Sequence, residues 1–131
     1  MILKKKLIII VVFLSVFSCN EIDKSSVVEV ITVEEMDSLL QMGKVQLIDV
    51  RTPKEYAEGY IKGALNIDFR NENFEELILK VDKTKPVAVY CAKGGRSGKC
   101  SEFMKNAGFT KIYDLDGGIT EWKFKGKEIV K

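Results

Sequence analysis

The chain has 131 residues, which is enough for one domain of ordinary size. It carries 21 lysines and arginines, 19 aspartates and glutamates and no histidine, for a formal net charge of +2. The lack of histidine excludes Ser–His and Cys–His hydrolases, histidine-ligated zinc or haem, and histidine general bases. Catalysis therefore has to come from cysteine, lysine, arginine, acidic residues, tyrosine or backbone amides.

A basic start and an apolar core identify residues 1–18 as a signal peptide. Lys4, Lys5 and Lys6 precede an apolar run of about ten residues. The run is too short to span a bilayer, which takes about 20 residues, but it is typical of a signal-peptide core. We prefer this interpretation to a buried strand or helix because the run lacks polar periodicity. Its end, "VFSC", resembles a bacterial lipobox with Cys19 as the lipidated residue, and ordinary secretion is the alternative.

Removal of this leader changes the charge of the protein. Three of the 21 cationic residues lie in it, which leaves 18 against 19 acidic residues. The basic excess therefore belongs to the leader and gives no support for nucleic-acid binding. We expect a polar tether over residues 19–29 and a lipid anchor in a bacterial membrane. The domain would then lie in the cell envelope and face the periplasm or the exterior.

Short apolar runs alternate with helical segments over the rest of the chain. We expect strands at 27–32, 45–50, 64–69, 86–91 and 111–115, and helices at 33–42, 53–58, 73–81, 97–107 and 119–126. Thr32 and Glu35 form a predicted capping box, and Gly43 ends that helix. The alternation predicts an α/β domain over residues 30–131, with a central parallel sheet of about five strands and helices on both faces.

One cysteine lies where such a sheet places its ligands, beyond the carboxyl end of a strand. Cys91 ends the most apolar run and is followed by a loop that contains Gly94 and Gly95, with Lys93 and Arg96 as cations. A strand-to-helix turn of this kind brings backbone N–H groups together at a helix N-terminus, and it favours a thiolate with a lowered pKa. The alternative is a buried structural cysteine.

Two segments resemble a known family. "LIDVRTPKEYAEGYIKGALNIDF" (47–69) and "VYCAKGGRSGKCSEFMKNAGFTKIYDLDGGITEW" (89–122) are similar to a single rhodanese domain, and the resemblance extends over residues 30 to about 127. It implies a three-layer rhodanese-like fold. It also implies a sulfurtransferase that moves a sulfane sulfur from a small anionic donor such as thiosulfate to cyanide or a thiol. Cys91 would carry the sulfur as a persulfide, and no metal or organic cofactor is implied. The matching anion-binding loop is Ala92, Lys93, Gly94, Gly95, Arg96 and Ser97.

The resemblance leaves several roles open. Lys93 could contact the anionic donor or remain a solvated surface lysine. Arg96 could bind the donor or pair with Glu55 and brace the loop, and we favour bracing. Asp49 and Arg51 fit a supporting role, as an ion pair that holds nearby loops, better than direct contact with substrate.

The spacing of the loop bears on the substrate. Arg96 follows Cys91 as C-x4-R. Phosphatases that share this fold use a loop one residue longer, so the resemblance favours sulfur over phosphate or arsenate. An alternative function is a sulfur-carrier or protein-recognition module with little turnover on thiosulfate.

The third cysteine invites the idea of a resolving thiol for Cys91. Cys100, Phe103, Met104 and Ala107 recur at the spacing of one helix face. A small hydrophobic core residue is therefore the preferred interpretation of Cys100.

Overall fold

The computed structural model describes residues 27–131 of the chain. The predicted signal peptide, Cys19 and most of the predicted tether lie outside these residues. Within residues 27–131, no helix has the length and apolar character that crossing a membrane requires.

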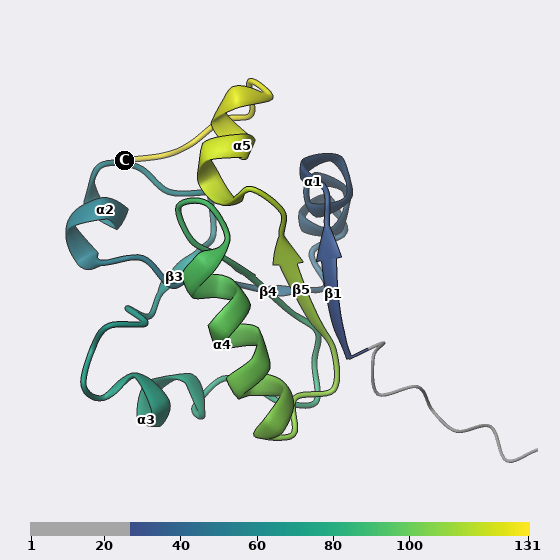
Figure 1. Cartoon of the computed structure of the whole chain (residues 1–131). Coiled ribbons are helices and arrows are strands. Elements are labelled where there is room, and N and C mark those ends of the chain that lie inside the picture. Colours follow the sequence, from purple (N-terminus) through teal and green to yellow (C-terminus); the bar gives the residue numbers. More distant parts are fainter. Residues whose placement is uncertain (1–26) are drawn as a thin grey trace, which may run out of the picture.

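Five parallel strands form one sheet in the order β1-β5-β4-β2-β3 (Figure 1). The strands are β1 (Val28–Ile31), β2 (Gln46–Asp49), β3 (Leu65–Asn66), β4 (Val87–Tyr90) and β5 (Ile112–Leu115). The first strand lies at an edge, as its half-polar sequence predicts, and β4, the most apolar, lies at the centre. The predicted α/β class and the parallel five-stranded sheet are confirmed.

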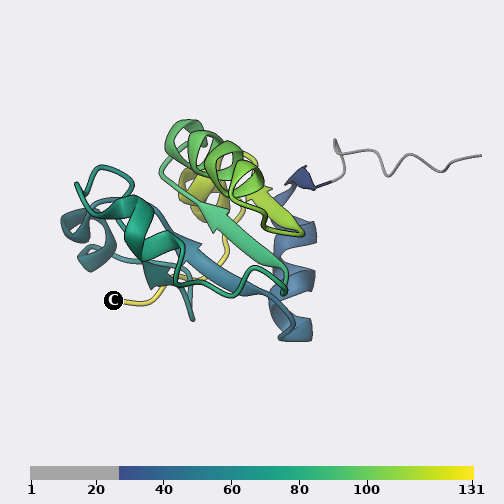
Figure 2. The same ribbon diagram turned by 90° about the horizontal axis from the view of Figure 1, so that it is seen from below.

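Helices cover both faces of this sheet. Figure 2 shows α3 (Phe74–Ile78) and α4 (Gly95–Asn106) on one face and α1 (Val33–Met42) on the other. The shorter helices α2 (Pro53–Ala57) and α5 (Gly118–Phe124) pack on the same side as α1. Successive residues of β4 alternate between the two cores, with Val87 and Val89 facing α4, and Ala88 and Tyr90 facing α1 and α5.

The capping box predicted at Thr32 and the helix end predicted at Gly43 are confirmed. The hydroxyl of Thr32 accepts a hydrogen bond from the Glu35 N–H, and the Glu35 carboxylate accepts one from the Thr32 N–H. Gly43 ends α1 in the left-handed region, with φ of +67°. Thr52 and Glu55 repeat the capping box at the start of α2. These bonds satisfy backbone donors that a helix start would otherwise leave unpaired.

Three element boundaries differ from the prediction. The strand expected at 64–69 pairs as a ladder only over Leu65–Asn66, although the N–H groups of Ile67 and Phe69 still bond to the carbonyls of Asp49 and Val50. The helix expected at 73–81 is confined to 74–78. The helix expected from residue 97 begins at 95, because the preceding glycine turns the backbone there.

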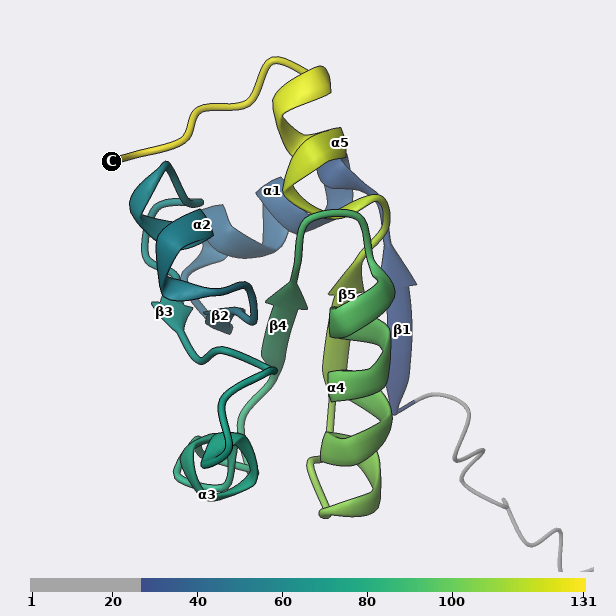
Figure 3. The same cartoon turned by 60° about the vertical axis from the view of Figure 1, so that its left-hand side comes forward.

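The carboxyl ends of the five parallel strands lie together at one end of the sheet, and this is the end where Cys91 lies. Figure 3 shows the chain leaving β4, forming a loop under α5 and entering α4. Cys91 is the first residue of this loop. Val28 begins β1 and lies level with Val87, which begins β4, so it is at the opposite end of the strands from Cys91.

Candidate active site at the end of β4

Cys91 is buried at the carboxyl end of β4. It follows Tyr90 directly, and only 1 % of its surface is exposed. Its Sγ accepts a hydrogen bond from the backbone N–H of Gly94 at 3.0 Å. The loop therefore folds back over the sulfur rather than away from it.

The loop favours the thiolate form of this cysteine. Burial alone would raise the pKa of the Cys91 thiol, because an apolar environment disfavours the charged form. Hydrogen bonds from the Ser97 hydroxyl and from the backbone N–H groups of Ser97, Gly94 and Lys93 outweigh that effect and lower the pKa below its ordinary value. The negative charge of a thiolate at this position would be met by several donors at once.

Gly94 makes this convergence possible. It occupies the N-cap position of α4 with φ of +112°, a backbone conformation that other residues resist. Its N–H bonds to the sulfur, while its carbonyl accepts the first backbone bond of α4 from the Gly98 N–H at 3.0 Å. One residue thus closes the loop and starts the helix.

Helix α5 fixes the orientation of the first two peptide groups of the loop. The N–H groups of Ile119 and Thr120 donate to the carbonyls of Cys91 and Ala92 at 2.9 and 3.1 Å. A Cβ at Gly118 would lie only 2.5 Å from the Cys91 carbonyl oxygen. Because these carbonyls are held by α5, the loop N–H groups remain available to the sulfur. The sequence signal for this contact is the doublet Gly117–Gly118 after the last strand, which alone does not reveal that Gly118 packs against the loop.

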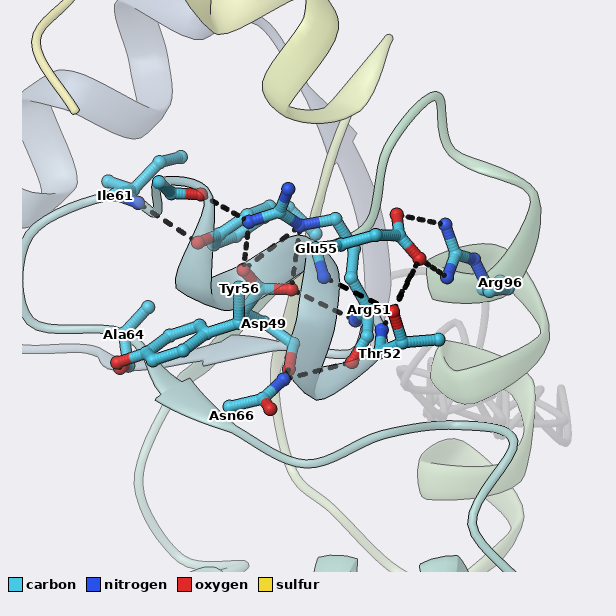
Figure 4. Close-up of polar contacts among 11 residues, drawn as sticks. Asp49, Arg51, Thr52, Glu55, Tyr56, Ile61, Ala64, Asn66 and Arg96 are labelled. Carbon is cyan, nitrogen blue, oxygen red and sulfur yellow. Dashed lines mark hydrogen bonds and ion pairs between the residues drawn. The ribbon is translucent and has the colours of Figure 1, made fainter. Parts of the chain in front are cut away.

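Arg96 is turned toward α2 rather than toward the sulfur. Its Nη1 and Nη2 donate to Oε1 and Oε2 of Glu55 at 2.7 and 2.9 Å (Figure 4). The contact with Glu55 that the sequence analysis favours is therefore present. Glu55 is itself fixed by the Thr52 capping box, and the bond to Arg96 lowers its pKa to about 2. The pair joins the start of α4 to the start of α2.

Asp49 and Arg51 form a second, deeper ion pair. The Arg51 Nη2 lies 2.7 Å from the Asp49 Oδ2 and donates to the Gly59 carbonyl at 2.7 Å, and both charged side chains are buried (Figure 4). The Arg51 guanidinium also lies over the ring of Tyr90, whose side chain belongs to the core on the α1 side. Through the Gly59 carbonyl, this pair holds the chain that follows α2. It lies on the Tyr90 side of the sheet, whereas Cys91 belongs to the core on the other side.

The two remaining polar candidates differ in exposure. Lys93 is exposed, and among residues 27–131 no carboxylate forms an ion pair with it. Cys100 is fully buried, its Sγ lies 3.6 Å from the Met104 sulfur, and burial raises its pKa to about 12. The interpretation of Cys100 as a core residue is confirmed. In the described part of the chain, no group of three or more acidic or cysteine side chains could hold a metal ion.

One buried acid near the loop was not identified from the sequence. Asp114 on β5 is 7 % exposed, and its Oδ1 has no hydrogen-bond partner among the described residues. Its carboxyl lies beside the first turn of α4 and interacts with the Ser97 hydroxyl. A polar residue at the α4-facing position of a buried strand is the signal that could have revealed it.

Comparisons with protein families and curated proteins agree with this geometry. A family model described as a rhodanese-like domain matches residues 32–125. An uncharacterised protein YqhL of Bacillus subtilis is 34 % identical over 124 residues, which cover 93 % of this chain and 95 % of that protein. A thiosulfate sulfurtransferase, GlpE, of Shewanella oneidensis is 30 % identical over 92 residues, covering 70 % of this chain and 89 % of that enzyme.

Another relative is a larger protein. The tRNA uridine(34) hydroxylase of Escherichia coli is 33 % identical over 110 residues, which cover 81 % of this chain but only 31 % of that enzyme.

Solved structures show the same fold. A rhodanese-related protein from Thermoplasma volcanium has a TM-score of 0.70 at 29 % identity and covers 78 % of this chain and 97 % of its own. A rhodanese-like domain protein from Staphylococcus aureus has a TM-score of 0.67 at 32 % identity, and the match covers 79 % of this chain and 99 % of that protein.

Proposed function

Because the chain belongs to the rhodanese-like domain family, we propose that it is a sulfurtransferase that carries a sulfane sulfur as a persulfide on Cys91. The observation that carries this proposal is the set of loop donors around one buried thiol, which together lower its pKa. The same donors suit a persulfide, whose negative charge resides on the outer sulfur. The similarity to an enzyme named thiosulfate sulfurtransferase supports the choice of chemistry.

The reaction balances without a metal or redox cofactor. The Cys91 thiolate attacks the outer sulfur of thiosulfate, the S–S bond of the donor breaks, and sulfite leaves with the bonding electron pair. The product is Cys91–S–S⁻. A thiophilic acceptor such as cyanide then attacks the outer sulfur, leaves as thiocyanate and regenerates the thiolate. Each step exchanges one sulfur–sulfur bond for another bond to sulfur, and no proton transfer is required.

The loop residues would divide the work. The backbone N–H groups of Lys93, Gly94 and Ser97 would stabilise the anionic sulfur, while Gly95 and Ala92 shape the turn. The Lys93 side chain, exposed and unpaired within residues 27–131, would attract the dianionic donor. Arg96 would not contact the donor but would hold the loop in place through its ion pair with Glu55. The burial of Cys91 favours a small donor over a bulky one.

Attachment to a membrane through Cys19 is a separate part of the proposal. It is supported by the basic and apolar leader and the lipobox-like "VFSC". β1 begins at the amino end of the parallel strands, whereas Cys91 lies at their carboxyl end. A tether that joins the domain at Val28 would therefore leave the Cys91 loop facing away from the anchor. Membrane attachment is tested by comparing the amounts of protein in membrane and soluble fractions for the wild type and for Cys19→Ser. We expect the wild type in the membrane fraction and the variant in the soluble fraction.

The sulfur-transfer proposal is tested by intact mass. The protein is weighed before incubation with thiosulfate, after it, and again after addition of cyanide. We expect a gain of one sulfur that cyanide removes, and no gain in Cys91→Ser. Cys100→Ala is the matched control and should still gain the sulfur. A wild-type protein that never gains sulfur from thiosulfate would contradict thiosulfate transfer and favour a sulfur-carrier or recognition module.

A further inference from the structure

A pocket of about 300 Å³ lies between α4 and the segment that leads from β3 into α3. Phe69, Phe74 and Phe103 form its apolar part. Phe74 is buried and meets the two other rings, both half-buried, edge to face. The ring centroids are 4.9 Å apart for Phe69 and Phe74 and 5.9 Å apart for Phe74 and Phe103. Edge-to-face contacts of this kind extend readily to a further ring, so the pocket suits an aromatic group.

This pocket lies on the same face of the sheet as Cys91. Cys91 and Val50 belong to the core under α3 and α4, and Phe69 packs against that core. The Phe69 N–H donates to the Val50 carbonyl at 3.1 Å. The Val50 N–H in turn donates at 3.0 Å to the carbonyl of Tyr90, which directly precedes Cys91. Neighbouring strands are about 4.8 Å apart, so these two steps separate the backbones at Phe69 and Cys91 by roughly 10 Å.

The rim of the pocket carries charges that are not used in ion pairs. Glu72 just before α3, Glu75 on α3 and Lys99 on α4 line the pocket, and all three are exposed. Among residues 27–131, none of them forms an ion pair. Two carboxylates and one ammonium group leave the rim net negative, so it favours a cationic group next to the aromatic one.

The size of the pocket and its distance from Cys91 favour a peptide over a small molecule. The volume is at the lower end of the range for small-molecule sites, about 300–1,000 Å³, and suits a single aromatic side chain. Cyanide or thiosulfate at Cys91 would not reach across about 10 Å. In the polyproline II conformation a peptide has 3 residues per turn and rises about 3.1 Å per residue. Side chains three residues apart then lie on the same side and about 9 Å apart, which matches the distance from Cys91 to Phe69.

We propose that this pocket binds an aromatic side chain of a peptide segment that accepts the sulfur from Cys91, with the acceptor cysteine three residues away and a basic residue beside the aromatic one. The inference rests on the proposed sulfur transfer and names the class of its acceptor. In the transfer step, the thiolate of the peptide attacks the outer sulfur of Cys91–S–S⁻. The S–S bond breaks, the Cys91 thiolate leaves with the bonding electron pair, and the peptide becomes the persulfide.

The test uses two synthetic peptides capped at both ends, Cys-Ser-Ser-Phe-Lys and Lys-Phe-Ser-Ser-Cys, so that both chain directions are covered. The full chain is loaded with thiosulfate and freed of it, and the sulfur that each peptide then gains is followed by mass. For the better peptide we expect a transfer rate constant about 10-fold higher than for its form with alanine in place of phenylalanine. Moving phenylalanine next to cysteine should abolish this advantage. Equal rates for the phenylalanine and alanine peptides would overturn the proposal.

Two changes in the pocket and one control locate the effect. Each rate is divided by the rate with cyanide, which corrects for any change at Cys91 itself. Phe103→Leu removes one ring, and the advantage of phenylalanine should fall to about 3-fold or less. Glu72→Gln combined with Glu75→Gln should reduce, at low salt, the preference for lysine over glutamine in the peptide. Tyr113→Leu is the matched control, because this half-buried aromatic residue packs on the α1 side, and it should keep the full advantage. An advantage that persists unchanged in Phe103→Leu would overturn the proposal.

A binding measurement separates this inference from the sulfur-transfer proposal. Peptides with serine in place of cysteine are titrated into the unloaded full chain by isothermal titration calorimetry. The phenylalanine peptide should bind about 10-fold more tightly than the alanine peptide, and equal affinities would overturn the pocket. A chain that thiosulfate never loads would contradict the proposed function, whereas this titration would still decide on the pocket. If Phe103→Leu fails to fold by circular dichroism, an unchanged preference for lysine in the exposed double variant of Glu72 and Glu75 would overturn the proposal.

Discussion

Arg96 and Glu55 are joined by two hydrogen bonds of 2.7 and 2.9 Å, one from each terminal nitrogen of the guanidinium to a different carboxylate oxygen. Their side chains are 17 % and 30 % exposed, so the pair is shielded from water on most sides. It ties the loop that follows Cys91 to a helix built from a distant part of the chain. Because the guanidinium and the carboxylate bind each other, Arg96 holds the loop after Cys91 in place.

Glu55→Gln should destabilise the protein in a pH-dependent way. The bond to Arg96 lowers the pKa of Glu55 from 4.5 to about 2. The stabilisation is therefore fully present above about pH 4.5 and is lost as the pH falls through about 2. At pH 7 we expect a loss of about 1–2 kcal/mol in the free energy of unfolding, measured by urea denaturation. The difference from wild type should narrow toward pH 2.

The control for this variant is Glu58→Gln, which removes an exposed carboxylate at the end of the same helix. Among the described residues it forms no ion pair, and we expect a change within about 0.5 kcal/mol. If Glu55→Gln left stability unchanged and instead altered only the KM for the donor, Arg96 would have to act on the substrate.

Alkylation should distinguish the two described cysteines. The pKa of Cys91 is lowered by the loop, whereas burial raises that of Cys100 to about 12. At pH 7 the Cys91 peptide should therefore react with iodoacetamide at least about 100-fold faster than the Cys100 peptide. In urea both should react at similar rates, because the environments that separate them are lost. Comparable rates in the folded protein would show that Cys100 is accessible and could act as a resolving thiol.

The sequence predicts those features that depend on neighbouring residues. The capping box at Thr32 involves a partner three residues along the chain, and the central position of β4 follows from its uninterrupted apolar run. The packing of Gly118 against Cys91 and the placement of Asp114 near Ser97 depend on how β5 and α5 lie beside β4. Such contacts are set by the register of the whole sheet, which a single sequence does not specify.

Gly118→Ala should disrupt the loop. The new Cβ would meet the carbonyl oxygens of Cys91 and Ala92 at 2.5 and 2.6 Å, and both are backbone atoms that cannot move aside. We expect a loss of more than about 3 kcal/mol in the free energy of unfolding, or failure to accumulate folded protein. Thermal and urea denaturation measure the loss.

Gly43→Ala provides the matched control for backbone strain. Gly43 has a similar positive φ of +67°, but nothing lies within 4 Å of its Cβ position. It should therefore cost only the left-handed penalty of about 1–2 kcal/mol and leave the Cys91 alkylation rate unchanged. Equal losses in the two variants would mean that strain alone, and not contact with the loop, determines the need for glycine at position 118.

Lys93→Gln should weaken binding of an anionic donor without changing the chemistry at sulfur. Lys93 is exposed, and its own backbone N–H, which the substitution retains, is the group that helps to lower the pKa of Cys91. We expect the KM for thiosulfate to rise about 3- to 10-fold with little change in kcat, and the rise to shrink at high salt, where exposed charges are screened. Lys99→Gln is the control, since Lys99 is an exposed lysine on α4, outside the loop, and should leave KM nearly unchanged. Equal effects of the two substitutions would indicate attraction by the general charge of this face, and a fall in kcat alone would place Lys93 in the transfer step itself.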